Sequence, residues 1–396
     1  MATETEIKKA AERKRPINRV QSMYALRAEM DKQYQDTVKA QKEGRPIAWC
    51  TDRISGTFLN VMDVENIYPE NYGTSCAAAG LATAYINRSE AEGFPNFVCS
   101  YAQNCFGYTA RMMELGQIPP EAPRGGMPKP ALLVGNCGTT CDTRYKWIQS
   151  LGRYLDVPVW ITEAPGPLQR EALMPGVYER DVKLIVDDLR DFVAFIEKLF
   201  HKKFDYAKFE KNNDQAMEMT NYWYEITEEL RKARPSPMHA RDHYSCFGVV
   251  SYNVTEPGRV KELFKKMYDE VKYRVDNKIS GINTEEKYRV SWAATGPWHS
   301  MNIFDELAER GWNFPRQGYN AQPPIDLSWV KDPIEKLVRY RRRSLEWNID
   351  HDFPPEEATE VKKEIMEKGF TDKLDVVDAR DYQLDGVILH SAITCR

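Results

Sequence analysis

Long hydrophobic runs are missing from this 396-residue sequence. No stretch approaches 18 consecutive apolar residues, so the sequence predicts no transmembrane helix and no membrane partner. The first 20 residues are polar and lack the apolar core of a secretory signal, so we expect a cytoplasmic protein. An excess of basic charge is missing too. The 55 Lys and Arg against 59 Asp and Glu give a net charge of −4, which argues against a dedicated nucleic-acid binder.

Several binding motifs are also absent. The eight cysteines include no C-x-x-C pair, which argues against a zinc ribbon or a bacterial-ferredoxin run, and they are too few for a disulfide scaffold. Neither G-x-x-x-x-G-K-[ST] nor G-x-G-x-x-G occurs. The chain is therefore not expected to hydrolyse ATP or to bind a dinucleotide by itself.

What is present is an alternation of short apolar runs and helical segments. The runs at 46–49, 131–135, 157–161 and 386–390, and the alternating residues at 288–292, predict strands of parallel sheets covered on both faces. Between them, apolar residues spaced three and four apart over 179–200 and 260–275 predict long amphipathic helices. The fold class is thus α/β with a helical insertion. We divide it into an N-terminal helical arm (1–45), a first α/β domain (46–178), a helical subdomain (179–278) and a second α/β domain (279–396).

Local signals predict further helices. Residues 74–91 are small, rich in Ala and bounded by glycines, as in one continuous helix. Asp332 before Pro333, with Glu335 following, is a strong helix start. The basic stretch 339–343 lies on that helix and is expected to form a solvated face available for docking a charged partner.

Three cysteines share one setting. Cys99 follows the apolar residues 96–98, Cys141 follows the run 131–135, and Cys395 follows the run 386–390. Each is expected just beyond the carboxyl end of a strand, the edge where α/β sheets bind ligands. A helix beginning after Cys99 or Cys141 favours a thiolate through its N-terminal amides. Three thiolates from separate loops can hold an iron–sulfur cluster with one iron left open.

The alternative for any cysteine is a small buried hydrophobic side chain. We interpret Cys50, Cys76 and Cys246 in this way. Cys105 and Cys137 stand close in sequence to Cys99 and Cys141, and remain alternative ligands.

Among six histidines, His299 is the best candidate for proton transfer, because it follows Trp298 in a loop directly after the predicted strand 288–293. The alternative is a helix-entry loop in which Trp298 only packs.

Three sequence stretches resemble a known family. YPENY at 68–72 with CSY at 99–101, TCDT at 140–143 with DVPV at 156–159, and DGVI at 385–388 leading to CR at 395–396 occur in the order seen in the 2-hydroxyacyl-CoA dehydratase and benzoyl-CoA reductase family. The stretches 107–111 and 119–123 are more similar to the benzoyl-CoA reductase branch. This resemblance favours an oxidoreductase that reduces an aromatic acyl-CoA ring by single electrons in anaerobic aromatic degradation. The alternative within the family is a lyase, a 2-hydroxyacyl-CoA dehydratase that removes water through a ketyl radical.

The resemblance implies two Rossmann-like domains and a 4Fe–4S cluster held by Cys99, Cys141 and Cys395. It also implies an acyl-CoA thioester substrate, a homologous sister subunit and a separate ATP-hydrolysing iron–sulfur activator. We expect Tyr72, Trp298 and His299 near the acyl group, with His299 as proton donor. Family members continue past the third cysteine, so we expect the last domain to be cut short and the strand 386–390 to be half exposed.

Two further hypotheses remain open at this point. One is a non-catalytic, cluster-bearing electron-transfer subunit of the same fold. The other is an α/β protein without metal.

Overall fold

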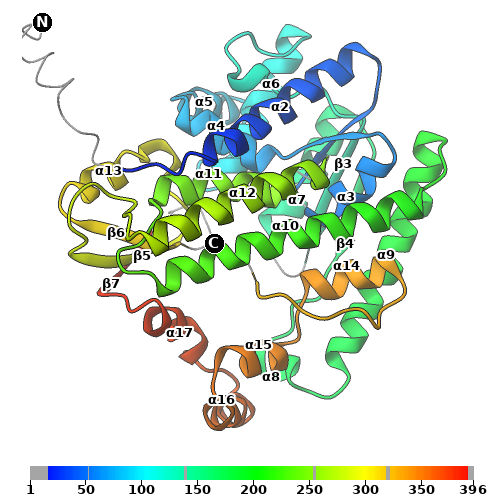
Figure 1. Cartoon of the computed structure of the whole chain (residues 1–396). Coiled ribbons are helices and arrows are strands. Elements are labelled where there is room, and N and C mark those ends of the chain that lie inside the picture. The colour runs from blue at the N-terminus through cyan, green and yellow to red at the C-terminus, as the bar shows by residue number, and fades with distance from the viewer. Residues whose placement is uncertain (1–16, 52, 138–140, 253–255, 318–321, 391–396) are drawn as a thin grey trace, which may run out of the picture.

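The computed structural model describes residues 17–51, 53–137, 141–252, 256–317 and 322–390. Two separate parallel sheets and a group of long helices make up the molecule (Figure 1). The expected α/β class, with parallel sheets in two parts of the chain and long helices between them in sequence, is confirmed.

The first sheet has the strand order β2-β1-β3-β4, and all its pairs are parallel. Its strands are β1 (Ile47–Cys50), β2 (Glu65–Ile67), β3 (Leu132–Cys137) and β4 (Val159–Glu163). Successive side chains alternate between the two faces. Cys50 and Val134 belong to the core on one face, and Trp49 and Leu133 to the core on the other.

Helices cover both faces of this sheet. One face packs against α3 (Arg53–Val61), α9 (Val177–Phe200) and α14 (Pro333–Arg341). The other packs against α4 (Pro69–Ala78), α6 (Ser100–Leu115), α7 (Thr143–Leu155) and part of α2 (Met23–Lys42). The buried residues of α9, which include Val182, Ile185 and Leu189, have the spacing that predicted an amphipathic helix.

The segment 74–91 is not one helix, so that expectation is wrong. It belongs to α4 and α5 (Ala82–Ala91), which are separated at Gly80. Gly80 has φ +74°, a left-handed conformation that ends an α-helix and that glycine adopts without steric cost. The break allows α5 to pack against α6.

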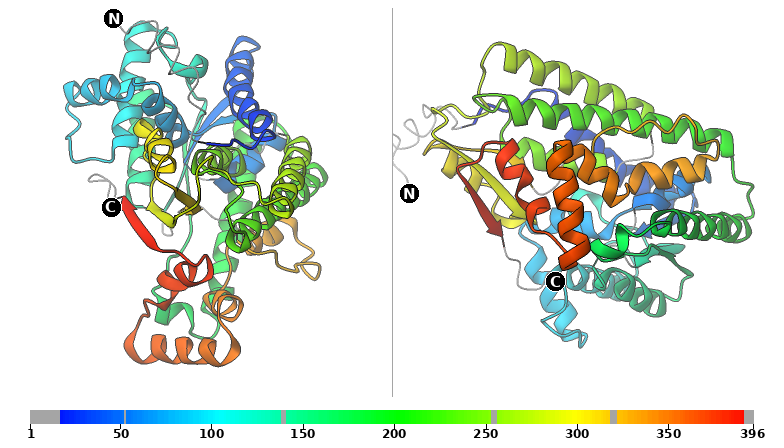
Figure 2. Two further views of the ribbon diagram at one scale, coloured as in Figure 1. Left: turned by 60° about the vertical axis from the view of Figure 1, so that its left-hand side comes forward. Right: turned by 90° about the horizontal axis from the view of Figure 1, so that it is seen from below.

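The long helices form their own core. They are α10 (Tyr206–Lys232), α11 (Ala240–Tyr252) and α12 (Pro257–Asp276). The first half of α2 joins them, with Met23 and Leu26 buried beside Trp223 and Phe264. In Figure 2 α10 and α12 run side by side along one side of the molecule. Since α10 contacts both α3 and β6, it connects the two sheets.

The second sheet has the strand order β6-β5-β7, again parallel. Its strands are β5 (Tyr288–Ala294), β6 (Trp312–Gln317) and β7 (Gly386–His390), and β5 leads into η2 (Trp298–Ser300) and α13 (Ile303–Ala308). Trp292, Phe304 and Phe314 form the aromatic core below it. On β7, Val387 and Leu389 are 55% and 73% exposed, so one face of this strand is exposed, as expected.

The remaining helices complete the chain. α8 (Gln169–Ala172) precedes α9, whereas α15 (Leu345–Asp352), α16 (Pro355–Lys368) and α17 (Lys373–Asp381) form a small peripheral group next to β7 (Figure 2). The N-cap prediction for α14 is confirmed, because the Asp332 carboxylate accepts the backbone N–H groups of Ile334 and Glu335. None of the described helices is long and apolar enough to cross a membrane.

The basic stretch 339–343 is not the exposed docking face that the sequence suggested. Arg339 is 8% exposed and forms ion pairs with Glu179 and Glu335. Arg343 is 7% exposed and donates hydrogen bonds to backbone carbonyl groups, among them that of Tyr340. Arg339 is buried because α14 packs against α9, which places the Glu179 carboxylate beside it, and Arg343, just after α14, also donates to the carbonyl of Pro323.

Candidate active site

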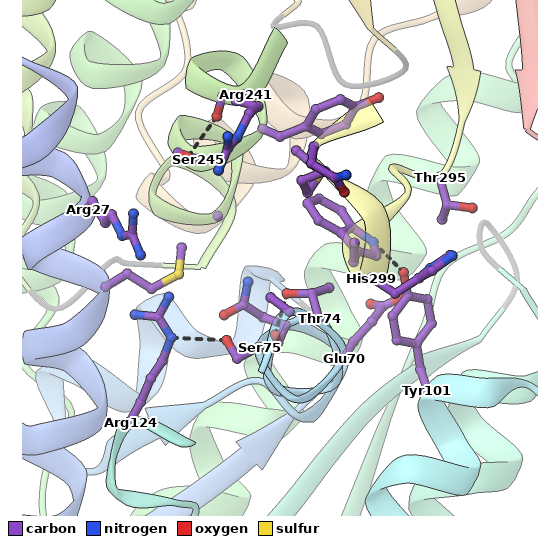
Figure 3. A pocket seen from close by; sticks show the side chains of 18 of the residues that line it. Arg27, Glu70, Thr74, Ser75, Tyr101, Arg124, Arg241, Ser245, Thr295 and His299 are labelled. Carbon is purple, nitrogen blue, oxygen red and sulfur yellow. Dashed lines mark hydrogen bonds between the residues drawn. The ribbon is translucent and has the colours of Figure 1, made fainter. Parts of the chain in front are cut away.

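A cavity of about 450 Å³ lies where the two α/β parts meet the long helices. Its wall is built from α2, α4, the starts of α6 and α7, η1 (Pro123–Gly125), α11, and the loop and η2 that follow β5 (Figure 3). This volume is within the usual range for small-molecule sites. The cavity is therefore the strongest candidate site in the described part of the chain.

Cys99 and Cys141 are not among the residues that line the cavity, but Cys99 is next to Glu70 and Tyr101, which form one end of it. Cys99 directly precedes α6, and its sulfur accepts hydrogen bonds from the backbone N–H groups of Tyr101 and Ala102. Cys141 stands two residues before α7 and is close enough for its charge to act on Cys99. Burial raises the pKa of the Cys99 thiol, while the two N–H donors oppose that rise. The structure thus brings two of the three predicted thiols together at the N-termini of two helices.

The strand expected before Cys99 is absent. Residues 92–99 form turns after α5, and the backbone N–H of Val98 donates to the carbonyl of Pro95. Phe94 stacks on Phe106 of α6 at 3.9 Å, which fixes this loop against the helix that it precedes. Residues 96–98 therefore belong to a loop and not to a strand, and Phe97 in this run is 68% exposed.

Glu70 and Arg144 form an ion pair on the cavity wall. The Arg144 Nη2 donates to Glu70 Oε2 at 2.6 Å, and both side chains are largely buried. Glu70 is on α4 and Arg144 on α7, so the pair joins these helices next to the two thiols. The Glu70 carboxylate is also close enough to Cys99 to raise the pKa of that thiol. Burial and the charge of Cys141 raise the same pKa more strongly.

The opposite wall comes from the loop after β5. Trp298 lines the cavity, and its indole N–H donates to the Tyr101 hydroxyl at 2.7 Å, which links the second α/β part to the start of α6. Tyr244 of α11 packs edge-on against Trp298 at 5.3 Å. His299 also lines the cavity, with an exposed side chain near Tyr101 (Figure 3).

The carboxyl end of β7 reaches this wall. The Nδ1–H of His390 donates to the carbonyl oxygen of Thr295, a cavity residue, at 2.6 Å. Cys395, the third predicted ligand, lies outside the described residues. Within the described residues no group of three or more His, Cys, Asp or Glu side chains is positioned to hold a metal ion.

Tyr72 does not line the cavity, unlike the other two residues expected near the acyl group. Its ring is fully buried between Tyr34 and Tyr108, and its hydroxyl donates to the carbonyl of Pro123. The structure therefore gives Tyr72 a packing position on the far side of α4.

The other cysteines occupy separate positions. Cys50, Cys76 and Cys246 lie in hydrophobic cores, as interpreted from the sequence. Cys105 is buried within α6, where burial raises its pKa to about 12. Cys137 is half-buried at the end of β3, where burial and the Glu163 carboxylate raise the pKa of its thiol.

Sequence reasoning missed the charged residues of the site. On α4, Glu70, Thr74 and Ala78 are spaced by four, so they share the face that lines the cavity, whereas Tyr72 points to the other side. That spacing was visible in the sequence. In contrast, the sequence does not show that Arg27, Arg124 and Arg241 line one cavity, because they come from three distant elements, α2, η1 and α11.

Comparison with known proteins adds a family match. The family described as 2-hydroxyglutaryl-CoA dehydratase, D-component, matches residues 61–396. The lactoyl-CoA dehydratase subunit alpha of Anaerotignum propionicum is 25% identical over 91% of this chain and 81% of that subunit. The (R)-2-hydroxyisocaproyl-CoA dehydratase alpha subunit of Clostridioides difficile is 27% identical over 67% of this chain and 62% of that subunit, which is under two thirds of its length. The (R)-2-hydroxyglutaryl-CoA dehydratase subunit alpha of Acidaminococcus fermentans is 20% identical over 94% and 86%.

These matches correct one expectation. The benzoyl-CoA reductase branch finds no support, and the assignment to the oxidoreductases is wrong, because these relatives are named dehydratases, which are lyases.

Proposed function

This chain belongs to the 2-hydroxyglutaryl-CoA dehydratase D-component family, and from this premise we propose that it is a subunit of an enzyme that removes water from a 2-hydroxyacyl-CoA thioester. The observation that carries the proposal is the cavity between the two α/β parts, because its lining residues Glu70 and Tyr101 are next to the Cys99 thiol. The dehydratase names of the relatives support the reaction class.

We further propose that Cys99 and Cys141, with Cys395, hold a 4Fe–4S cluster. The described residues fit such a group: the two sulfurs are close to each other, and two backbone N–H groups point at Cys99. Each thiol also precedes a helix, whose N-terminal dipole favours negative charge. When bound, the cluster would supply two functions: an iron that acts as a Lewis acid on a substrate oxygen, and a carrier for single electrons.

The chain's own residues then bind the thioester and manage its protons. Trp298 and Tyr101 form a hydrogen-bonded wall that confines the acyl group beside the thiols. Dehydration removes the C2 hydroxyl as water, which requires one added proton, and releases one proton from C3. A ring nitrogen of His299, which faces the cavity, is the proposed donor to the departing hydroxyl.

The proposed partners follow from what the chain lacks. Without a P-loop it cannot couple ATP hydrolysis to electron delivery, so a separate ATP-hydrolysing iron–sulfur activator supplies the electron. The relatives are named alpha subunits, which supports assembly with a homologous sister subunit.

The test is anaerobic reconstitution. The full chain, its sister subunit, the activator and Mg-ATP are incubated with lactoyl-CoA, and loss of water is followed by mass spectrometry. Cys99→Ala is compared with Cys246→Ala, the same substitution in the helical core, where the Cys246 thiol lies 3.5 Å from the Met267 sulfur. We expect Cys99→Ala to lose iron, sulfide and turnover, and Cys246→Ala to keep iron.

Wild-type iron content and activity in Cys99→Ala would overturn the cluster assignment. Steady dehydration by the chain alone, without activator and ATP, would overturn the proposed partners.

A further inference from the structure

Guanidinium groups dominate the charge on the cavity wall. The residues that line the cavity include five arginines but only one carboxylate, that of Glu70. The carboxylates that hold Arg124 and Arg241, namely Asp31 and Asp305, are not among the lining residues. An anionic ligand in the cavity therefore contacts the guanidinium groups of Arg124 and Arg241 and not the carboxylates that pair with them.

Three of these arginines retain N–H groups for a ligand. Arg27 is exposed on α2 and forms no ion pair within the described part of the chain. Arg124 uses Nη1 for Asp31 and Nε for the Ser75 hydroxyl at 3.1 Å. The contacts with Asp31 and Ser75 hold the guanidinium plane in place, and Nη2 has no hydrogen bond among the described residues.

Arg241 is held in a similar way. Its Nη1 donates to Asp305 at 2.5 Å, which leaves its other guanidinium N–H groups toward the cavity. A fixed guanidinium fork matches the oxygens of a phosphate group, and several of them are needed for a ligand with more than one negative charge.

Two of these three arginines lie at the end of the cavity away from the thiols. Figure 3 shows Arg27 and Arg124 on the left, Arg241 at the top of the view, and Glu70, Tyr101 and His299 on the right. The end on the right is the one beside Cys99, since Tyr101 donates its backbone N–H to the Cys99 sulfur. The cavity therefore offers a cationic end, contributed by α2 and η1, and a thiol end, contributed by α6 and α7.

We propose that Arg27, Arg124 and Arg241 form a subsite for the phosphate groups of the CoA moiety, which orients the thioester toward Cys99 and Cys141. This inference rests on the proposed function, because it takes a CoA thioester as the ligand. It adds which residues recognise the nucleotide part and in which direction the ligand lies. A CoA ligand carries a pyrophosphate and a 3′-phosphate, and the geometry fits either source.

The test compares three probes by titration calorimetry on the full chain: lactoyl-CoA, its 3′-dephospho form and lactoyl-pantetheine, which has no phosphate. The variant is Arg27→Gln, whose exposed side chain can be replaced without opening the core. The control is Lys39→Gln, which removes the same charge from the same helix, where Lys39 is 70% exposed and pairs with Glu43 at 3.7 Å.

We expect Arg27→Gln to weaken lactoyl-CoA binding about tenfold, as is typical of one charge-assisted hydrogen bond, and to leave lactoyl-pantetheine binding unchanged. Lys39→Gln should stay within twofold of the wild type for both probes. Arg241→Gln should repeat the result from a second helix. If the effect of Arg27→Gln persists with the dephospho form, the pyrophosphate is the group recognised, and if it vanishes, the 3′-phosphate is.

Other outcomes distinguish a failure of the phosphate subsite from a failure of the proposed function. If the wild type binds lactoyl-CoA and lactoyl-pantetheine equally well, or if Arg27→Gln and Lys39→Gln weaken lactoyl-CoA binding by the same factor, the phosphate subsite is wrong while the proposed function stands. If neither thioester binds to the wild type, the proposed function fails first.

Discussion

Replacing Gly107 by Ala tests how closely α5 and α6 approach each other. Gly107 lies on α6 two turns after Cys99, with its backbone against the end of the first turn of α5. A Cβ atom at this position would be 1.7 Å from the carbonyl oxygen of Tyr85 and 2.5 Å from its carbonyl carbon. Both are backbone atoms, so no side-chain rotation relieves the clash and the two helices have to separate.

The expected effect opposes the one that helix propensity alone gives. In an isolated helix, Ala is more favourable than Gly by about 1 kcal/mol. Overpacking a well-packed contact costs about 3 kcal/mol when backbone must move. The net destabilisation is therefore about 2 kcal/mol. With an unfolding entropy of about 2.1 cal/mol/K per residue, the whole chain loses about 2–3 °C in Tm.

The assay is thermal unfolding followed by circular dichroism, with Gly258→Ala as the matched control. Gly258 is in the first turn of α12, and the atoms nearest to its added Cβ, at 2.9 Å, belong to the far end of the Gln215 side chain, which can move. We expect an unchanged or slightly higher Tm for Gly258→Ala and a lower Tm for Gly107→Ala. A higher Tm for Gly107→Ala would refute the close approach.

Three further predictions concern single side chains. Burial lowers the pKa of His239 to about 3, against about 6.5 in the unfolded chain. The free energy of unfolding therefore has its full value above pH 6.5 and falls by about 1.4 kcal/mol per pH unit as the pH drops toward 3. His239→Gln should flatten the fall of the urea midpoint between pH 6.5 and 4, and parallel curves would contradict this. His299→Gln should lower kcat about a hundredfold, whereas an unaltered kcat would exclude it as proton donor. Asp332→Ala removes the acceptor for the N–H groups of Ile334 and Glu335 and should cost about 1 kcal/mol in urea unfolding, with Asp332→Asn retaining most of it.

The sequence determined those features that depend on neighbouring residues. Apolar runs of four or five residues predicted β1, β3 and β7, and the spacing of apolar residues predicted α9 and α12, because each pattern follows from the periodicity of one element. The N-cap at Asp332 was also local, because its carboxylate accepts the N–H groups of the first turn of its own helix. The setting of Cys141, between β3 and α7, followed from the same patterns.

The tertiary structure decided which side chains meet. The sequence placed Tyr72 near the substrate, but the orientation of α4 buries it and turns Glu70 into the cavity. It treated Arg339 as solvated, but packing of α14 against α9 places a carboxylate beside it. Arg27, Arg124 and Arg241 come from α2, η1 and α11, about a hundred residues apart from one to the next, and no local pattern links them. Local patterns specify the conformation of a segment, whereas a binding site depends on how distant segments are oriented, and that orientation is set by the packing of all the elements together.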